Sequence, residues 1–201
     1  MEYELIALSQ LDNGQIKRLS ALHCSVMHTL LADLGLPVVL RYYQVAQANR
    51  DVLGFCAVSQ SGELLGWAIG SSQPDMINAR LRTPLLWFAA QILRLALTRP
   101  GVLWQLITSV VSSSSQADMK NGAMELTYIG VASNQRGRGL GKELLNAFIK
   151  SSQTKGYRSV VLSVEQENVP ATSLYEKAGF KIIKSFSEGH YQRHRMELIL
   201  A

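Results

Sequence analysis

The sequence predicts one α/β domain, and three observations support this fold class. Strand-like and helix-like segments alternate along the second half of the chain, as they do where helices pack on a sheet. The length of 201 residues suits one domain with its own hydrophobic core. Apolar residues make up 47% of the chain and charged residues 17%, which is too hydrophobic for a disordered protein. We therefore expect residues 1–201 to fold as a single domain.

The first half of the chain shows strand, helix and hairpin patterns in turn. A short strand is expected at residues 3–8. Over residues 13–35, apolar side chains recur at three- and four-residue spacing, which predicts an amphipathic helix broken once. A second helical pattern covers residues 38–48. Two β-rich runs, residues 52–59 and 63–70, flank a Ser-Gly turn and predict a hairpin.

Residues 74–115 are expected to form a helical insertion. The polar side chains of residues 84–97 form one narrow stripe, so almost every other side of this helix needs apolar cover. A second apolar helix is expected at residues 102–111, and a serine-rich loop follows over residues 112–122. We favour a helical hairpin packed on the core. A homodimer contact, a wall for a hydrophobic substrate and an interfacial membrane helix are the alternatives.

Strands and helices alternate more regularly in the second half, with antiparallel strands expected at its end. The elements are listed here by their residues: strands at 125–132, 159–164, 180–187 and 191–200, and helices at 139–153 and 170–178.

A basic, glycine-rich turn follows the strand at residues 125–132. It reads Gln-Arg-Gly-Arg-Gly-Leu-Gly-Lys over residues 135–142, and its glycines let the backbone approach a ligand closely. The next helix directs free N–H groups and the positive end of its dipole at the same place. This combination favours a phosphate, with a basic turn that binds nothing as the alternative. The glycine spacing differs from the dinucleotide fingerprint, and a nucleoside-triphosphate loop would end in Gly-Lys-Ser/Thr.

A second motif covers residues 168–180 and reads Asn-Val-Pro-Ala-Thr-Ser-Leu-Tyr-Glu-Lys-Ala-Gly-Phe. Asn168 is expected at a helix entrance, where its amide can bind free N–H groups or a ligand. Tyr175 lies little more than one turn inside the helix, near the edge of the core. A tyrosine there is more often a core residue than an acid, so a catalytic role needs supporting residues.

Together the two motifs closely resemble those of the GNAT superfamily of acyl-CoA-dependent N-acetyltransferases. The resemblance covers residues 124–187 and includes Arg-x-x-Gly-x-Gly at residues 136–141, followed by Asn-x-x-Ala-x-x-Leu-Tyr at residues 168–175. It implies the GNAT fold, in which a mixed central sheet contains a splayed strand pair and carries helices on both faces. It also implies acetyl-CoA as co-substrate, with no metal.

The resemblance assigns cofactor contacts residue by residue. The backbone of the glycine-rich turn would bind the pyrophosphate of coenzyme A, and the splayed strand would pair with the pantetheine arm. The amide of Ile129 would face the thioester oxygen and stabilise an oxyanion. Asn168 would support the cofactor or the splayed strand. The implied cofactor residues are Ile129, Gly130, Val131, Arg136, Gly137, Arg138, Gly139, Leu140, Gly141, Lys142, Asn168 and Tyr175.

Two residues are expected to move protons. By the resemblance, Tyr175 would protonate the departing thiolate of coenzyme A. Glu125, at the start of the splayed strand, would act through water as the base that deprotonates the amine, although a carboxylate there is often only ion-paired. The residues His190, Tyr191 and His194 are competing candidates for the base.

The expected function is direct transfer of an acetyl group from acetyl-CoA to a primary amine. A small-molecule acceptor is favoured because the insertion could close over the site. A protein or peptide acceptor and a non-catalytic acyl-CoA-binding module are the alternatives. The net charge of +5 also allows nucleic acid, but six basic residues and one acid occupy residues 134–160, where phosphates of the cofactor would lie. We therefore expect no nucleic-acid partner.

The remaining composition points to an ordinary cytoplasmic protein. Cys24 and Cys56 have no spacing for zinc or for a disulfide framework. The acidic start of the chain does not resemble a secretory signal, and no apolar stretch reaches the length of a transmembrane helix. We expect cytoplasmic localisation and no transmembrane segment.

Overall fold

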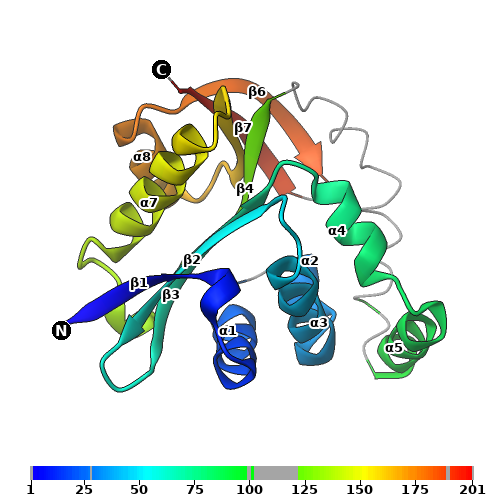
Figure 1. The fold of residues 1–201 in the computed structure, drawn as a ribbon. Coiled ribbons are helices and arrows are strands. Elements are labelled where there is room, and N and C mark those ends of the chain that lie inside the picture. The colour runs from blue at the N-terminus through cyan, green and yellow to red at the C-terminus, as the bar shows by residue number, and fades with distance from the viewer. Residues whose placement is uncertain (1, 28, 99–100, 102–121, 189–190, 201) are drawn as a thin grey trace.

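The computed structural model describes residues 2–27, 29–98, 101, 122–188 and 191–200. Figure 1 shows that helices and strands alternate as the sequence predicts. The strands are β1 (Tyr3–Ala7), β2 (Val52–Ser59), β3 (Leu64–Ser71), β4 (Ala123–Val131), β5 (Ser159–Glu165), β6 (Lys181–Glu188) and β7 (Tyr191–Ile199). The helices are α1 (Asn13–Val26), α2 (Leu30–Asp33), α3 (Leu36–Gln47), α4 (Pro74–Leu81), α5 (Leu85–Thr98), α7 (Leu140–Thr154) and α8 (Val169–Lys177), with short turns η1 (Leu8–Gln10) and η3 (Ser133–Gln135). The helix expected at residues 102–111, most of the serine-rich loop and His190 lie outside the described residues.

The described strands form one mixed sheet in the order β1-β2-β3-β4-β5-β7-β6. Only β4 and β5 run parallel, and the other neighbouring strands pair antiparallel. Helices α1 to α4 lie on one side of this sheet, and α7 and α8 lie on the other (Figure 1). This arrangement confirms the expected fold class, including helices on both faces.

The broken N-terminal helix follows from local capping. The Asp12 side chain accepts a hydrogen bond from the backbone N–H of Gln15 at 2.7 Å, and the Gln15 side-chain oxygen accepts one from the backbone N–H of Asp12 at 2.9 Å, which fixes the start of α1. Helix α1 ends at Val26, and at the start of α2 the Thr29 hydroxyl accepts a hydrogen bond from the amide of Ala32. Met27 and Thr29, which flank the two helices, both line the site described below.

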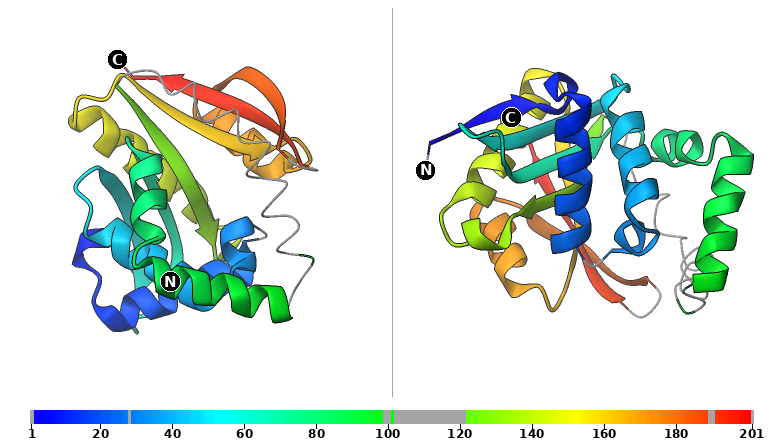
Figure 2. Two further views of the ribbon diagram at one scale, coloured as in Figure 1. Left: turned by 90° about the vertical axis from the view of Figure 1, so that its right-hand side faces the viewer. Right: turned by 90° about the horizontal axis from the view of Figure 1, so that it is seen from below.

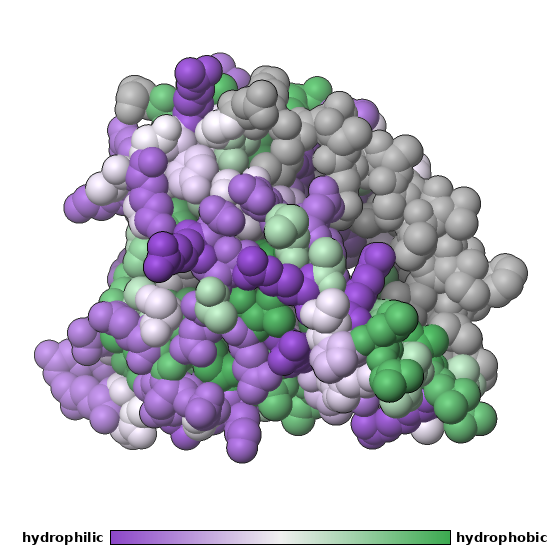
Figure 3. Space-filling model, turned by 45° about the vertical axis from the view of Figure 1, so that its right-hand side comes forward, coloured by the Kyte–Doolittle hydropathy of each residue, from purple (hydrophilic) through white to green (hydrophobic). Residues whose placement is uncertain are grey.

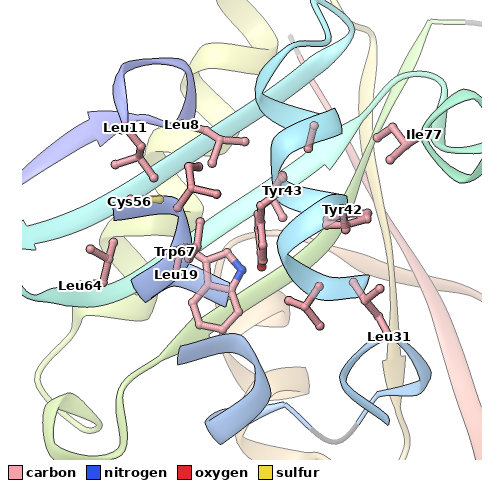
Figure 4. Packing of buried hydrophobic residues seen from close by; sticks show 14 of the residues in the cluster. Leu8, Leu11, Leu19, Leu31, Tyr42, Tyr43, Cys56, Leu64, Trp67 and Ile77 are labelled. Atoms are coloured by element: carbon pink, nitrogen blue, oxygen red, sulfur yellow. The ribbon is translucent and has the colours of Figure 1, made fainter. Parts of the chain in front are cut away.

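Two hydrophobic cores lie on the two faces of the sheet. The first core surrounds the fully buried Trp67 and joins β2 and β3 to α1, α3 and α4 (Figure 4). The second core surrounds Phe148 and joins the sheet to α7 and α8. Strands β4 and β5 pair along only part of their length, and residues packed in each core line the opening between them. The packing on both faces of the sheet therefore positions the site.

The insertion behaves differently from the expectation in one respect. Helix α4 packs on the first core through Ile77 and Leu81. Helix α5 buries Leu95 and packs Trp87 against the first core, but Leu86 is 87% exposed and Leu97 is 79% exposed, so much of its apolar surface lacks the cover that we expected. Figure 3 shows the resulting hydrophobic surface over α5. Among the described residues, every helix falls short of the length and apolarity that a membrane crossing needs.

Candidate functional site

The site begins where strands β4 and β5 separate. They pair in parallel over residues 123–126 of β4 and 159–162 of β5, and then diverge. Figure 2 shows the two strands leaving a common origin. At the same point the register between β3 and β4 shifts, because Ile69 pairs with Tyr128 and Gly70 pairs with Leu126. Thr127 is therefore the extra residue of a β-bulge, and the expected splayed pair is present.

Beyond the bulge, β4 directs alternate amides into the opening. The amide of Ala132 donates to the carbonyl of Leu65 on β3 at 2.8 Å. Because successive amides of a strand point to opposite edges, the N–H groups of Ile129 and Val131 face away from β3 and toward β5. Gly130, between them, leaves room for the ring of Trp67, which a Cβ would approach to 2.5 Å. The resemblance assigned Ile129 to a thioester oxygen, and its amide has the orientation that this role requires.

A cleft of about 610 Å³ occupies the opening and continues to both faces of the sheet. On one face its walls include Leu174 and Tyr175, which belong to the second core. On the other face they include Val26 and Met27, which pack against the first core. The cleft is thus a passage between the two layers, and a molecule entering from each face could meet the other between the strands.

The glycine-rich turn forms one end of this passage. Gly137 and Gly139 have φ angles of 76° and 84°, a region that favours glycine. Gly139 precedes α7, and no side chain caps this helix start. The amides of Leu140 and Gly141 are consequently the first-turn donors that can bind an anion, with the helix dipole adding to the attraction.

Most of the predicted cofactor residues come together along the cleft. Ten of them line it: Ile129, Gly130, Val131, Arg136, Gly137, Gly139, Leu140, Gly141, Asn168 and Tyr175. Arg138 and Lys142 do not belong to the lining, and both are exposed beside it. These two side chains can contribute positive charge to the mouth of the cleft but make no part of its wall.

Asn168 and Tyr175 are both placed by helix α8. The Asn168 side chain accepts a hydrogen bond from the amide of Ala171 at 3.2 Å, so it caps the helix as the sequence indicates. Tyr175 is 6% exposed, lines the cleft and packs against Phe180. Burial raises the pKa of Tyr175 to about 12, so its hydroxyl stays protonated at neutral pH.

Glu125, the expected base, forms an ion pair with Arg195. Its Oε1 accepts a hydrogen bond from Arg195 at 2.6 Å, and Arg195 also donates to the hydroxyl of Ser163 at 3.1 Å. The side chains of Glu125 and Arg195 are 19% and 12% exposed. Glu125 does not belong to the residues that line the cleft. The structure therefore places this carboxylate beside the site, bound to an arginine.

A buried aromatic group around His23 borders the cleft, and the sequence did not single it out. His23 is fully buried, with Nδ1 2.8 Å from the Tyr43 hydroxyl and Nε2 3.4 Å from that of Thr29. Its ring also contacts those of Trp67 and Tyr128. Burial lowers the pKa of His23 to about 4, so it is neutral at physiological pH. Since Thr29 and Tyr128 line the cleft, His23 supports its wall from behind.

The chain matches the family model described as the acetyltransferase (GNAT) family over residues 26–180. It belongs to this family. The match confirms the resemblance, and acetyl-CoA is the co-substrate that GNAT proteins use. Among the described residues, no group of three or more His, Cys, Asp or Glu side chains is placed to hold a metal ion.

Two curated relatives and one solved structure show how far the GNAT similarity extends. A mycothiol acetyltransferase of Paenarthrobacter aurescens is 43% identical over 171 residues, which cover 83% of this chain and 50% of that protein. One from Corynebacterium glutamicum is 41% identical over 61 residues, covering 30% of this chain and 21% of that protein. The chain thus matches half or less of these relatives' length. Arabidopsis thaliana NAA60 in complex with acetyl-CoA has a TM-score of 0.61 at 15% identity, covering 98% of each chain, and shows the shared fold.

Proposed function

We propose that this GNAT protein transfers an acetyl group directly from acetyl-CoA to a primary amine of a small molecule. The observation that carries the proposal is the passage between β4 and β5, which joins the glycine-rich turn, with its free first-turn amides, to the apolar side chains of Val26 and Met27 on the other face. The curated relatives are named mycothiol acetyltransferase, and from that name we take only support for a small-molecule substrate class.

Coenzyme A would enter from the face of α7 and α8. The amides of Leu140 and Gly141 would bind its pyrophosphate, with Arg136 beside them and Arg138 and Lys142 further out. The pantetheine arm would extend along β4, where it would meet the backbone amides that face β5. This placement brings the thioester to the middle of the passage, where the N–H of Ile129 would bind the carbonyl oxygen as it becomes an oxyanion.

Two protons must leave the acceptor nitrogen during the reaction. The attacking amine forms a C–N bond as the C–S bond of the thioester breaks. One proton passes to solvent, and the other ends on the sulfur of coenzyme A. Tyr175 supplies the sulfur with its proton and regains one from the nitrogen, because its hydroxyl remains protonated at neutral pH. In this mechanism Glu125 is a positioning residue. It accepts a hydrogen bond from Arg195, which also donates to the hydroxyl of Ser163.

An acetyl-transfer assay with an amine panel tests the proposal. Glucosamine, spermidine, benzylamine and a peptide with a free α-amino group would be offered with acetyl-CoA, and products identified by mass spectrometry. Acetylation of a small amine in preference to the peptide is expected. Preferred acetylation of the peptide would favour the protein-acceptor alternative, and acetyl-CoA binding without any transfer would favour a non-catalytic module.

Tyr175→Phe is expected to lower turnover by about 10²–10⁴-fold, the usual contribution of a general acid. The affinity for acetyl-CoA, measured by calorimetry, should stay within about twofold, since the lost hydroxyl acts on the leaving group and the ring is retained. Tyr157→Phe is the matched control, because Tyr157 packs at the edge of the same core without lining the cleft. Wild-type turnover in Tyr175→Phe would remove this residue from the mechanism.

A further inference from the structure

The acceptor side of the passage has a distinct character. Its walls include Val26 and Met27 at the end of α1 and the ring of Tyr128 on β4. These side chains are apolar or aromatic, and they pack against the first core, on the face opposite to α7 and α8. A primary amine entering here needs a partner for its positive charge, because an unpaired ammonium group is costly to remove from water.

Only one acidic side chain appears among the described residues that line the cleft, and it is Glu165. It lies at the end of β5, where Leu162 and Val164 point into the second core. Because strand side chains alternate, Glu165 and Ser163 lie on the opposite face, which is the acceptor face. The other charged residues of the lining are Arg136, at the glycine-rich turn, and Arg193.

Arg193 forms an ion pair with Glu165 and leaves the carboxylate able to accept hydrogen bonds. The two residues are paired across β5 and β7, and an Nη2 of Arg193 lies 3.9 Å from Oε1 of Glu165. This distance allows an ion pair but is longer than a direct hydrogen bond. The carboxylate can therefore still accept hydrogen bonds from an incoming group. The Glu165 side chain is 38% exposed, and that of Arg193 is 24% exposed. The guanidinium of Arg193 also lies over the ring of Tyr191, at 5.5 Å.

The contrast with Glu125 is informative because both acids lie beside the splayed strands. Glu125 already accepts a short hydrogen bond from Arg195 and stands outside the cleft lining. Glu165 has the longer contact, the greater exposure and a place in the wall. Of the two carboxylates, Glu165 is the one that a molecule inside the passage can reach.

We propose that Glu165 is the carboxylate that binds the ammonium group of the acceptor, and that the acceptor carries an apolar or aromatic body next to this group. The proposal rests on the proposed function for the identity of the reaction, and it adds the recognition of the amine. Arg193 is a positioning residue in this scheme, since it orients the carboxylate through their ion pair. The side chains of Val26, Met27 and Tyr128 contact the body of the acceptor.

A binding experiment with simple probes tests this proposal without turnover. Benzylammonium chloride and its neutral isostere benzyl alcohol would be titrated into the protein, with and without coenzyme A, and followed by NMR. The wild type should bind benzylammonium at least about tenfold more tightly than benzyl alcohol, because only the cation pairs with a carboxylate. Glu165→Gln should remove this preference while leaving benzyl alcohol binding unchanged.

Glu167→Gln is the matched control, because Glu167 is exposed two residues further on and does not line the cleft. It should retain the preference for the cation. A Glu165→Gln protein that still prefers benzylammonium would overturn the proposal, as would a wild type that binds neither probe or binds both equally. Failure of the proposed function would appear separately, as absent acetyl transfer in the amine panel.

Discussion

His23 shows how a single residue can matter to the site without touching a ligand. Its ring is enclosed by Tyr43, Trp67 and Tyr128, which come from α3, β3 and β4. The Nε2 atom lies beside the hydroxyl of Thr29, which caps α2 and lines the cleft. A neutral imidazole therefore links the sheet to Thr29 in the wall of the cleft.

The lowered pKa of His23 predicts a pH dependence of stability. In the unfolded chain the pKa is about 6.5, and in the folded protein it is about 4, so the unfolded state binds the proton first as the pH falls. Stability is then fully present above pH 6.5 and declines as the pH falls toward 4. We expect the free energy of unfolding in urea to drop by about 2 kcal/mol between pH 7.5 and pH 5 from this group.

Two substitutions isolate the contribution of His23 to that drop. His23→Gln should flatten the dependence over this pH range, whatever it costs at pH 7.5. His194→Gln, at a more accessible position where Nδ1 meets the Ser185 hydroxyl, should leave the slope as it is. An unchanged slope in His23→Gln would show that other groups cause the acid sensitivity.

The sequence could indicate Glu125 and Tyr175 because family motifs mark their positions along the chain. It could not indicate that Arg195 binds Glu125, because 70 residues separate the two and only strand pairing brings them together. The same limit applies to Glu165, whose significance depends on which face of β5 it occupies and on how the cleft opens. Motifs locate residues, whereas availability for a ligand depends on tertiary contacts.

At the scale of an element, the first turn of helix α7 is the part that we propose binds the phosphates of coenzyme A. Gly141 lies in that turn and lines the cleft, and a Cβ there would make only ordinary contacts with Val131 and Leu174 at 3.7 and 3.8 Å. Gly141 has no positive φ angle, unlike Gly137 and Gly139. A side chain can thus be added at this position without straining the backbone.

Gly141→Asp is expected to weaken acetyl-CoA binding by at least about 100-fold, since the new carboxylate would lie where the phosphates bind and would repel them. Gly141→Ala is the control, and its affinity should stay within about tenfold of the wild type. Calorimetry on both variants measures the difference. Equal affinity in the two would place the phosphates away from the start of α7.

Helix α5 shows that hydrophobic periodicity can predict the type of an element but not how deeply it is buried. Its apolar run predicts a helix over residues 84–97, and the structure has one at Leu85–Thr98. The pattern also suggested burial, because nearly every face is apolar. Only Leu95 of this helix is buried, and Trp87 packs partly buried against the first core. Hydrophobic pattern determines the type of element, and its distance from the core depends on the chain around it.

On the scale of the whole molecule, the two cores meet at the splayed strands. β4 contributes Tyr128 to the edge of the first core and Leu126 to the second. A ligand in the passage therefore contacts both layers at once. The family motifs made the sheet, the splayed pair and the glycine-rich turn predictable, whereas the cleft walls formed by Val26, Met27 and Arg193 lie in segments whose sequences carry no such motif.

Acetyl-CoA should stabilise the protein as a whole and protect one region locally. At a free concentration 100 times the Kd, binding raises the free energy of unfolding by about 2.7 kcal/mol. Hydrogen exchange should slow most in the second half of β4 and the first turn of α7, where we place amide contacts with the cofactor. Exchange in α5 should change little. Equal protection of α5 would instead make the insertion part of the cofactor site.

The bulge at Thr127 separates two pairing registers of β4. The pairing with β3 and β5 fixes residues 123–126, while the pairing with β3 alone fixes residues 128–131. Because Thr127 is the extra residue, its loss would leave Leu126 opposite Gly70 and Tyr128 opposite Ile69, and the amides of Ile129 and Val131 would keep their directions. Loss of Tyr128 as well would place Ile129 opposite Ile69 and turn its amide from the passage toward β3. Deletion of both residues should therefore reduce activity far more than deletion of Thr127 alone, even where the fold survives both changes.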